Sequence, residues 1–207
     1  MVAVIVLAAG TSSRYGANKL LLPFRDGTVI STVISTVLRT RARPVLVVTG
    51  HQADQVRQAL QAASDQVTFV HNPLYNSGEM LSSIKAGLQA VQMLPGARPT
   101  AVLITLGDQP LLQADVIQRL LTAHEQNCGD LIAPRFGLNG QRGHPVLIGR
   151  RWWQDVLALP QDSNVRELLR ANRDSLTQLV VGSDTILGDV DTPEAYRAAL
   201  AQSQAGP

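Results

Sequence analysis

The sequence of 207 residues is poor in charge and in cysteine. Charged residues make up only 16% and the net charge is +2, so the sequence lacks the basic surface that nucleic-acid binding requires. Its one cysteine, Cys128, has no second thiol to pair with, which fits a reducing cytoplasm. No apolar run is long enough for a signal peptide or a membrane span. We therefore expect a cytoplasmic protein without a nucleic-acid or membrane partner.

Two common glycine-rich nucleotide motifs are also missing from the first loop. The Walker A motif has the form G-x-x-x-x-G-K-[ST], whereas five residues separate Gly10 from Gly16 here and Lys19 follows three residues later. The dinucleotide fingerprint G-x-G-x-x-G does not fit this loop either. These absences argue against kinase-like ATP hydrolysis and against hydride transfer.

What the sequence does contain is an alternation of strand-length apolar runs with segments of helical periodicity. This alternation predicts an α/β domain with three layers and a mainly parallel sheet. One domain is expected over residues 1–207, and the stretch near 149–175 is interpreted as a small cap or insertion. We expect strands at 2–7, 45–49, 67–70, 101–106, 131–133 (ended by Pro134), 146–148 and 176–181. We expect helices at 29–39, 53–63, 80–93, 114–125, 153–157, 165–171 and 193–200, with a frayed tail at 202–207.

Polar motifs follow several of these strands, at the edge where open parallel sheets bind ligands. The loop from Gly10 to Lys19 combines small residues and hydroxyls with two cations, Arg14 and Lys19. Backbone N–H groups in such a loop can surround a phosphate. The alternative is an ordinary surface loop with two solvated cations.

Two aspartates come at positions that suit Mg²⁺, which prefers carboxylates and substrate phosphates. Asp108 follows the apolar run that ends at Leu106, and Asp191 stands before a predicted helix. Asp108 is alternatively a turn residue, and Asp191 alternatively starts the helix, a role that is compatible with metal binding. His144 either contacts an anionic substrate or packs at the start of a strand.

Five motifs, in one order over residues 2–200, together resemble the MobA-like nucleotidyltransferases. Residues 7–19, LAAGTSSRYGANK, are similar to the family's L-A-A-G-x-S-x-R-x-G-x-x-K motif, most of all in its molybdenum cofactor cytidylyltransferase branch. The other four are NPLYNSGEMLSS from residue 72, GDQP from 107, RGHPVLI from 142 and DVDTPE from 189. Two departures are Glu79, inserted where many members have Gly-Met, and QDSNVR from 161 in place of G-D-x-G-A-R.

The resemblance implies a Rossmann-like nucleotidyltransferase fold and Mg²⁺-dependent transfer of a nucleotide from an NTP. In the most similar branch, CTP reacts with the phosphate of molybdopterin to give the cytosine dinucleotide cofactor and pyrophosphate. Related guanylyltransferases usually have L-A-G-G, so Ala9 favours cytidine. An apo-molybdoenzyme or its maturation chaperone is a further partner that the resemblance suggests.

The resemblance also assigns site residues. It places the base and ribose against residues 7–9 and 72–83, the triphosphate on the first loop, the metal on two aspartates and the acceptor near His144 and the cap. The nucleotide-binding residues are then Leu7, Ala8, Ala9, Gly10, Ser12, Arg14, Lys19, Asn72, Gly78 and Ser82; the catalytic residues are Arg14, Lys19 and Asp108; the metal ligands are Asp108 and Asp191; and the acceptor-binding residues are His144, Asp162 and Arg166.

Two other functions are compatible with these motifs. A transferase of the same fold could use another NTP or another phosphorylated acceptor. A carrier or insertion chaperone would bind the finished cofactor without consuming an NTP. The combination of Lys19, Asp108 and Asp191 favours catalysis, because a carrier needs no metal-binding pair.

Overall fold

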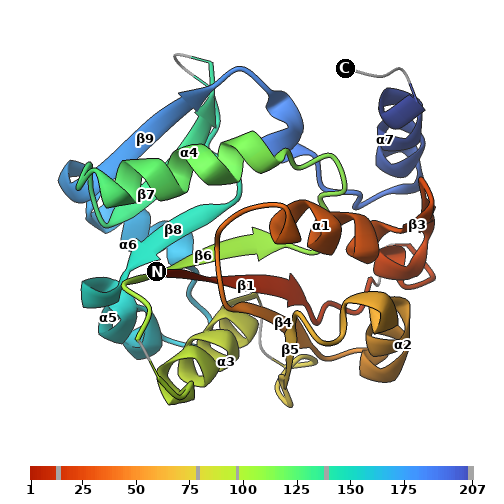
Figure 1. Cartoon of the computed structure of the whole chain (residues 1–207), viewed down its shortest axis with the longest axis horizontal. Helices are drawn as coiled ribbons and strands as arrows, with labels where there is room; N and C mark the ends of the chain where they lie inside the picture. Colours follow the sequence, from red (N-terminus) through yellow and green to blue (C-terminus); the bar gives the residue numbers. More distant parts are fainter. Residues whose placement is uncertain (13–14, 78–79, 97, 138–139, 205–207) are drawn as a thin grey trace.

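The apolar run after Met1 forms a strand inside a seven-stranded sheet (Figure 1). A computed structural model gives this fold and describes residues 1–12, 15–77, 80–96, 98–137 and 140–204. The strands of the sheet are β1 (Val2–Ala8), β4 (Val45–Thr49), β5 (Thr68–His71), β6 (Ala101–Leu106), β7 (Leu131–Phe136), β8 (Val146–Gly149) and β9 (Leu176–Val181).

The sheet is mainly parallel, as predicted. Its strand order is β5-β4-β1-β6-β8-β7-β9, and only β8 runs antiparallel to its neighbours. From β1 the chain adds β4 and β5 on one side and then returns to β6 on the other side of β1. The strand order therefore switches between β1 and β6, the place where open α/β sheets bind their ligands.

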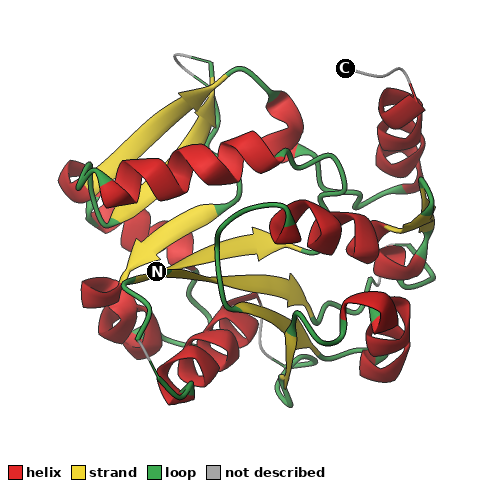
Figure 2. Cartoon of the chain, in the orientation of Figure 1, coloured by secondary structure: helices red, strands yellow, loops and turns green. Residues whose placement is uncertain are grey.

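Helices cover both faces of the sheet, which confirms the three-layer prediction (Figure 2). α1, α2 and α4 share a core with Val4 and Val6 of β1, and α3, α5 and α6 share another with Ala3 and Ile5. α7 packs instead beside a small hairpin of β2 (Pro23–Phe24) and β3 (Gly27–Thr28). The helices are α1 (Val29–Leu38), α2 (Ala53–Ala59), α3 (Met80–Met93), α4 (Ala114–Glu125), α5 (Trp153–Ala158), α6 (Val165–Ala171) and α7 (Pro193–Gln204).

Pro134 lies within β7, so the prediction that it ends this strand is wrong. It pairs in register with Leu179 of β9, and its carbonyl accepts a hydrogen bond from the Gly143 N–H at 3.1 Å. Gly143 leads into β8, on the side of β7 away from β9. The N–H and C=O of one strand residue point to the same side, so the missing N–H of proline leaves the ladder to β9 intact.

Two helices end several residues away from their predicted ends. The helix expected at 53–63 ends at Ala59, and a 3₁₀ turn, Gln61–Ala63, follows Leu60, whose side chain is buried. α7 continues to Gln204, so the expectation of a frayed tail is wrong for residues 202–204. Alanine and glutamine are good helix formers and no breaker intervenes; residues 205–207 lie outside the described ranges. Among the described residues, no helix combines the length and the apolar character needed to cross a bilayer.

Candidate nucleotide site

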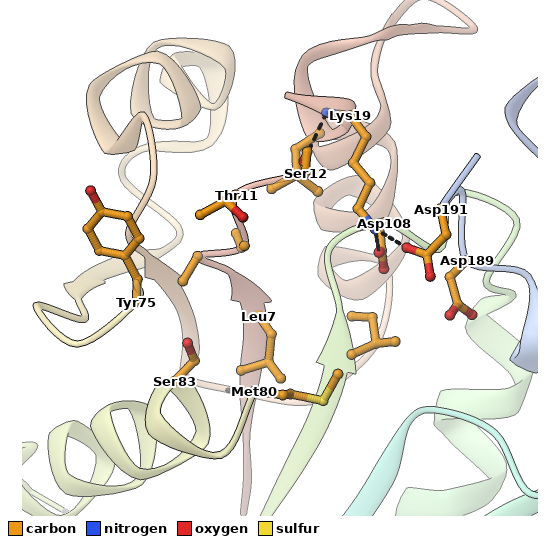
Figure 3. A pocket seen from close by; sticks show the side chains of 15 residues that line it. Leu7, Thr11, Ser12, Lys19, Tyr75, Met80, Ser83, Asp108, Asp189 and Asp191 are labelled. Atoms are coloured by element: carbon orange, nitrogen blue, oxygen red, sulfur yellow. Dashed lines mark hydrogen bonds and ion pairs between the residues drawn. The ribbon is translucent and has the colours of Figure 1, made fainter. Parts of the chain in front are cut away.

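A cavity of about 340 Å³ opens where β1 and β6 end, at the switch in strand order. Gly107 brings these two ends together: its N–H donates to the Leu7 carbonyl at 2.9 Å, and a Cβ at this position would lie 2.8 Å from the same oxygen. The cavity is lined by residues 7–12, Lys19, Leu20, Tyr75, Met80, Ser83, Leu106, Asp108, Asp189 and Asp191 (Figure 3).

The loop after β1 folds back on itself to bring Lys19 into the cavity. Ser12 adopts a left-handed backbone conformation with φ of 52°, and its hydroxyl accepts a hydrogen bond from the Lys19 N–H at 3.3 Å. The Asn18 side chain then caps the short 3₁₀ helix Lys19–Leu21 through the Leu20 N–H. Of the predicted nucleotide-binding residues, Leu7, Ala8, Ala9, Gly10, Ser12 and Lys19 line the cavity. Arg14 and Gly78 lie outside the described residues.

Lys19 joins the two predicted metal ligands. Its Nζ contacts Asp108 Oδ2 and Asp191 Oδ1 (Figure 3), and the Lys19 and Asp108 side chains are only 14% and 15% exposed. Burial alone would lower the pKa of Lys19, but the two carboxylates outweigh it and raise that pKa. Burial raises the pKa of Asp108 more than Lys19 lowers it, and the charges of Asp189 and Asp191 add to the rise.

The donor groups of this cluster fit a hard divalent cation. Asp108 Oδ1 is buried and has no hydrogen-bond partner among the described residues, so it is available as an oxygen ligand. No group of three acidic, histidine or cysteine side chains in the described ranges forms a metal cluster. Mg²⁺ does not need one, because it is commonly held by one or two carboxylates together with substrate phosphates and water.

Asn72 and Ser82 do not line this cavity but a second one of about 340 Å³ between α3 and α5. Asn72 is 1% exposed. Its Nδ2 donates to the hydroxyls of Ser82 at 2.9 Å and Ser83 at 3.0 Å, and its Oδ1 accepts from the Leu74 N–H at 3.0 Å. Asn72 therefore fastens the end of β5 to the first turn of α3, which carries Ser83 into the nucleotide cavity.

The predicted acceptor residues lie outside the cavity lining. His144 precedes β8, and its N–H donates to the Ile186 carbonyl at 3.0 Å. Burial lowers the pKa of His144, the nearby charge of Asp189 opposes this, and that of Arg166 adds to it. Asp162 and Arg166 are exposed, in the loop before α6 and on α6 itself. His144 is thus within electrostatic reach of both the cavity wall and α6.

Several cavity residues were not singled out from the sequence. Tyr75, Met80 and Ser83 belong to the segment 72–83 that was expected to contact the nucleoside, but no pattern showed which of its side chains face inward. Gly50 makes room for Tyr75, since a Cβ there would lie 2.5 Å from the Tyr75 Cβ. The sequence does contain a signal for Asp189, which stands two residues before Asp191. Side chains two residues apart lie on the same face of an extended segment, so this spacing could have predicted both aspartates at one wall of the cavity.

The chain matches a known protein family over most of its length. The model of the MobA-like NTP transferase domain matches residues 4–176. The molybdenum cofactor cytidylyltransferase of Escherichia coli (strain K12) is 31% identical over 93% of this chain and 92% of its own length.

Two solved structures are similar to this chain over almost its whole length. The crystal structure of Rv0371c from Mycobacterium tuberculosis H37Rv has a TM-score of 0.80 and 27% identity, covering 97% of both chains. A complex of Rv0371c with manganese has a TM-score of 0.76 and 25% identity, again covering 97% of both chains. Manganese is therefore part of at least one relative's crystal structure.

Proposed function

Because the chain belongs to the MobA-like NTP transferase family and is thus a nucleotidyltransferase, we propose that it transfers CMP from CTP to molybdopterin. The products are the cytosine dinucleotide cofactor and pyrophosphate. The observation that carries this proposal is the cluster of Lys19, Asp108 and Asp191 at one end of a cavity formed by the end of β1. The similarity to the E. coli cytidylyltransferase and the alanine at position 9 support CTP as the donor.

The two ends of the cavity suit the two ends of a nucleotide. Leu7, Tyr75 and Met80 form an apolar end, and Lys19 stands with the acidic groups at the other (Figure 3). We place the base and ribose at the apolar end and the triphosphate along the loop that follows Gly10. Arg14 belongs to this loop and is proposed as a second phosphate-binding cation.

The reaction needs positioning and charge neutralisation more than proton transfer. The acceptor phosphate is already ionised, so it attacks the α-phosphorus without a general base, and pyrophosphate leaves in line. Lys19 neutralises charge that develops on the phosphates, from a side chain whose orientation is set in advance by its contacts with Asp108 and Asp191.

Asp108 and Asp191 are the residues that would hold Mg²⁺, because both line the cavity and one buried oxygen of Asp108 has no hydrogen-bond partner in the part of the chain that the structure describes. When bound, the ion supplies Lewis-acid polarisation of the phosphate oxygens. The manganese complex of a relative supports a divalent cation here.

His144, Asp162 and Arg166 are proposed to contact the acceptor. The support is electrostatic: the charges of Asp189, on the cavity wall, and Arg166, on α6, both act on the His144 ring. An apo-molybdoenzyme that receives the product remains a proposed partner.

The donor is tested by the melting temperature of the protein with each of the four NTPs and Mg²⁺. A ligand at one hundred times its Kd stabilises the folded state by about 2.7 kcal/mol. For a chain of this size that corresponds to roughly 5–11 °C. We expect the largest shift with CTP; a larger shift with GTP, or equal shifts with all four, would contradict the assignment of the base.

A further inference from the structure

Gln109 is a buried amide directly beside the proposed metal ligand Asp108. Its side chain is 1% exposed, in the turn that follows β6. Both contacts of its Nε2 reach across to the segment before α7: it donates to the Ile186 carbonyl at 3.3 Å and to Asp189 Oδ1 at 3.2 Å. The Gln109 side chain thus joins the turn after β6 to the segment that carries Asp189 and Asp191.

The backbone holds the same two segments together. The Val190 N–H donates to the Asp108 carbonyl at 3.0 Å, and the Val190 side chain is buried against Phe24, Val29 and Ala199. With Val190 turned inward, its neighbours Asp189 and Asp191 face the cavity with Asp108 (Figure 3). The backbone sets the position of the segment, and among the described residues Gln109 makes the one hydrogen bond to the Asp189 side chain.

An amide donor has a consequence that a lysine or arginine would not have. Asp108, Asp189 and Asp191 share one described cation, Lys19, whose contacts go to Asp108 and Asp191. Repulsion between these carboxylates favours rotation of Asp189 away from the other two. An amide N–H opposes that rotation without neutralising the carboxylate, so the negative charge stays available to a ligand in the cavity.

We propose that Gln109 is a positioning residue, whose amide holds the Asp189 carboxylate toward the cavity so that its negative charge strengthens the binding of a divalent cation by Asp108 and Asp191. This inference rests on the metal site of the proposed function. It does not depend on which NTP or which acceptor the enzyme uses. Groups that orient metal-binding carboxylates typically contribute about 10–100-fold to metal affinity.

The test is a double-mutant cycle read by metal binding rather than by turnover. Mn²⁺ is titrated into the full chain without nucleotide, and the free ion is followed by its EPR signal. Gln109→Met, which keeps the length and loses the donor, should raise the Kd for Mn²⁺ about 10-fold, and Asp189→Asn should raise it similarly. Because Gln109 acts through Asp189, Gln109→Met should have little further effect in the Asp189→Asn background.

Gln118→Met is the matched control, since Gln118 is also an amide with a buried oxygen, on α4, and lines neither cavity. It should leave the Kd unchanged. Melting temperatures show whether each variant folds; if Gln109→Met does not, Gln109→Leu replaces it, because it is also apolar and lacks the donor.

The proposal is overturned if the folded Gln109 variant binds Mn²⁺ within two-fold of the unmodified chain. It is also overturned if the two substitutions weaken binding additively, or if the unmodified chain binds no Mn²⁺. A protein that binds Mn²⁺ as expected but releases no pyrophosphate with any NTP would contradict the proposed function and leave this inference standing.

Discussion

Replacing Lys19 by methionine removes the cation that contacts both proposed metal ligands while keeping most of the side-chain length. Two effects follow, one on the reaction and one on stability. If Lys19 faces charge that develops on the phosphates, its loss should lower kcat by about 100-fold or more, or about 2.7–4 kcal/mol. A residue that only binds the substrate would instead raise KM and leave kcat unchanged.

The stability effect follows from the position of Asp108. Its side chain is 15% exposed, and Oδ1 already has no partner among the described residues, so losing Lys19 leaves Oδ2 without its cation as well. A buried acceptor without a partner costs about 1–3 kcal/mol. At about 2–4 °C for each kcal/mol, the melting temperature should fall by a few degrees, which leaves the protein folded at assay temperature. Asp191 adds little, because its side chain is 46% exposed.

Pyrophosphate release under saturating CTP and Mg²⁺ measures kcat, and thermal unfolding measures stability. Lys85→Met is the matched control, because Lys85 lies on α3, lines the second cavity and donates to the Leu159 carbonyl at 2.5 Å. It should leave kcat within a few-fold. A folded Lys19→Met variant with kcat within a few-fold of the unmodified enzyme would refute the role given to Lys19.

Three further predictions concern other parts of the site. Asp108→Asn should abolish metal-dependent activity in a folded protein. Because burial and neighbouring acids raise the pKa of Asp108 above 3.8, kcat/KM of the unmodified enzyme at low metal should decrease as the pH is lowered through that raised pKa. A decrease that begins only at or below pH 3.8 would contradict this. Burial lowers the pKa of His144 below 6.5, so the unfolded chain takes up this proton first as the pH falls, and the folded state loses stability below pH 6.5. The melting temperature of His144→Leu should therefore rise relative to that of the unmodified protein as the pH is lowered from 7.5 to 5, and a constant difference would argue against this. Gly50→Ala places a Cβ 2.5 Å from the Tyr75 Cβ, so it should raise KM for the NTP and cost about 1–3 kcal/mol of stability. Gly182→Ala is the control, because a Cβ there meets nothing within 4 Å, and it should have neither effect.

The elements that carry the site were predictable because their sequence patterns are local. β6 and α3 have the predicted bounds, since an apolar run and a helical periodicity each leave a clear signal. Lys19, Asp108 and Asp191 are far apart in the chain, and it was the expectation that parallel strands end at one edge that placed them together. Their contacts in the structure agree with that expectation.

What could not be predicted depends on how one element is rotated against another. Asn72 and Ser82 stand in the expected segment but face the second cavity, while Tyr75 and Ser83 of the same segment face the first. A one-residue difference on the first turn of α3 turns a side chain by about 100°. The contact between Gln109 and Asp189 joins residues 80 positions apart, and no sequence periodicity indicates it.

Pyrophosphate release from the protein incubated with Mg²⁺, molybdopterin and each NTP in turn measures the proposed reaction itself. We expect release with CTP, in equal amount to the cytosine dinucleotide cofactor formed, and none when Mg²⁺ or molybdopterin is left out. Release with GTP but not CTP, or release that requires a different phosphorylated acceptor, would contradict the assigned substrates. No release with any NTP, from a protein that nevertheless binds the finished dinucleotide cofactor, would contradict catalysis and indicate a carrier.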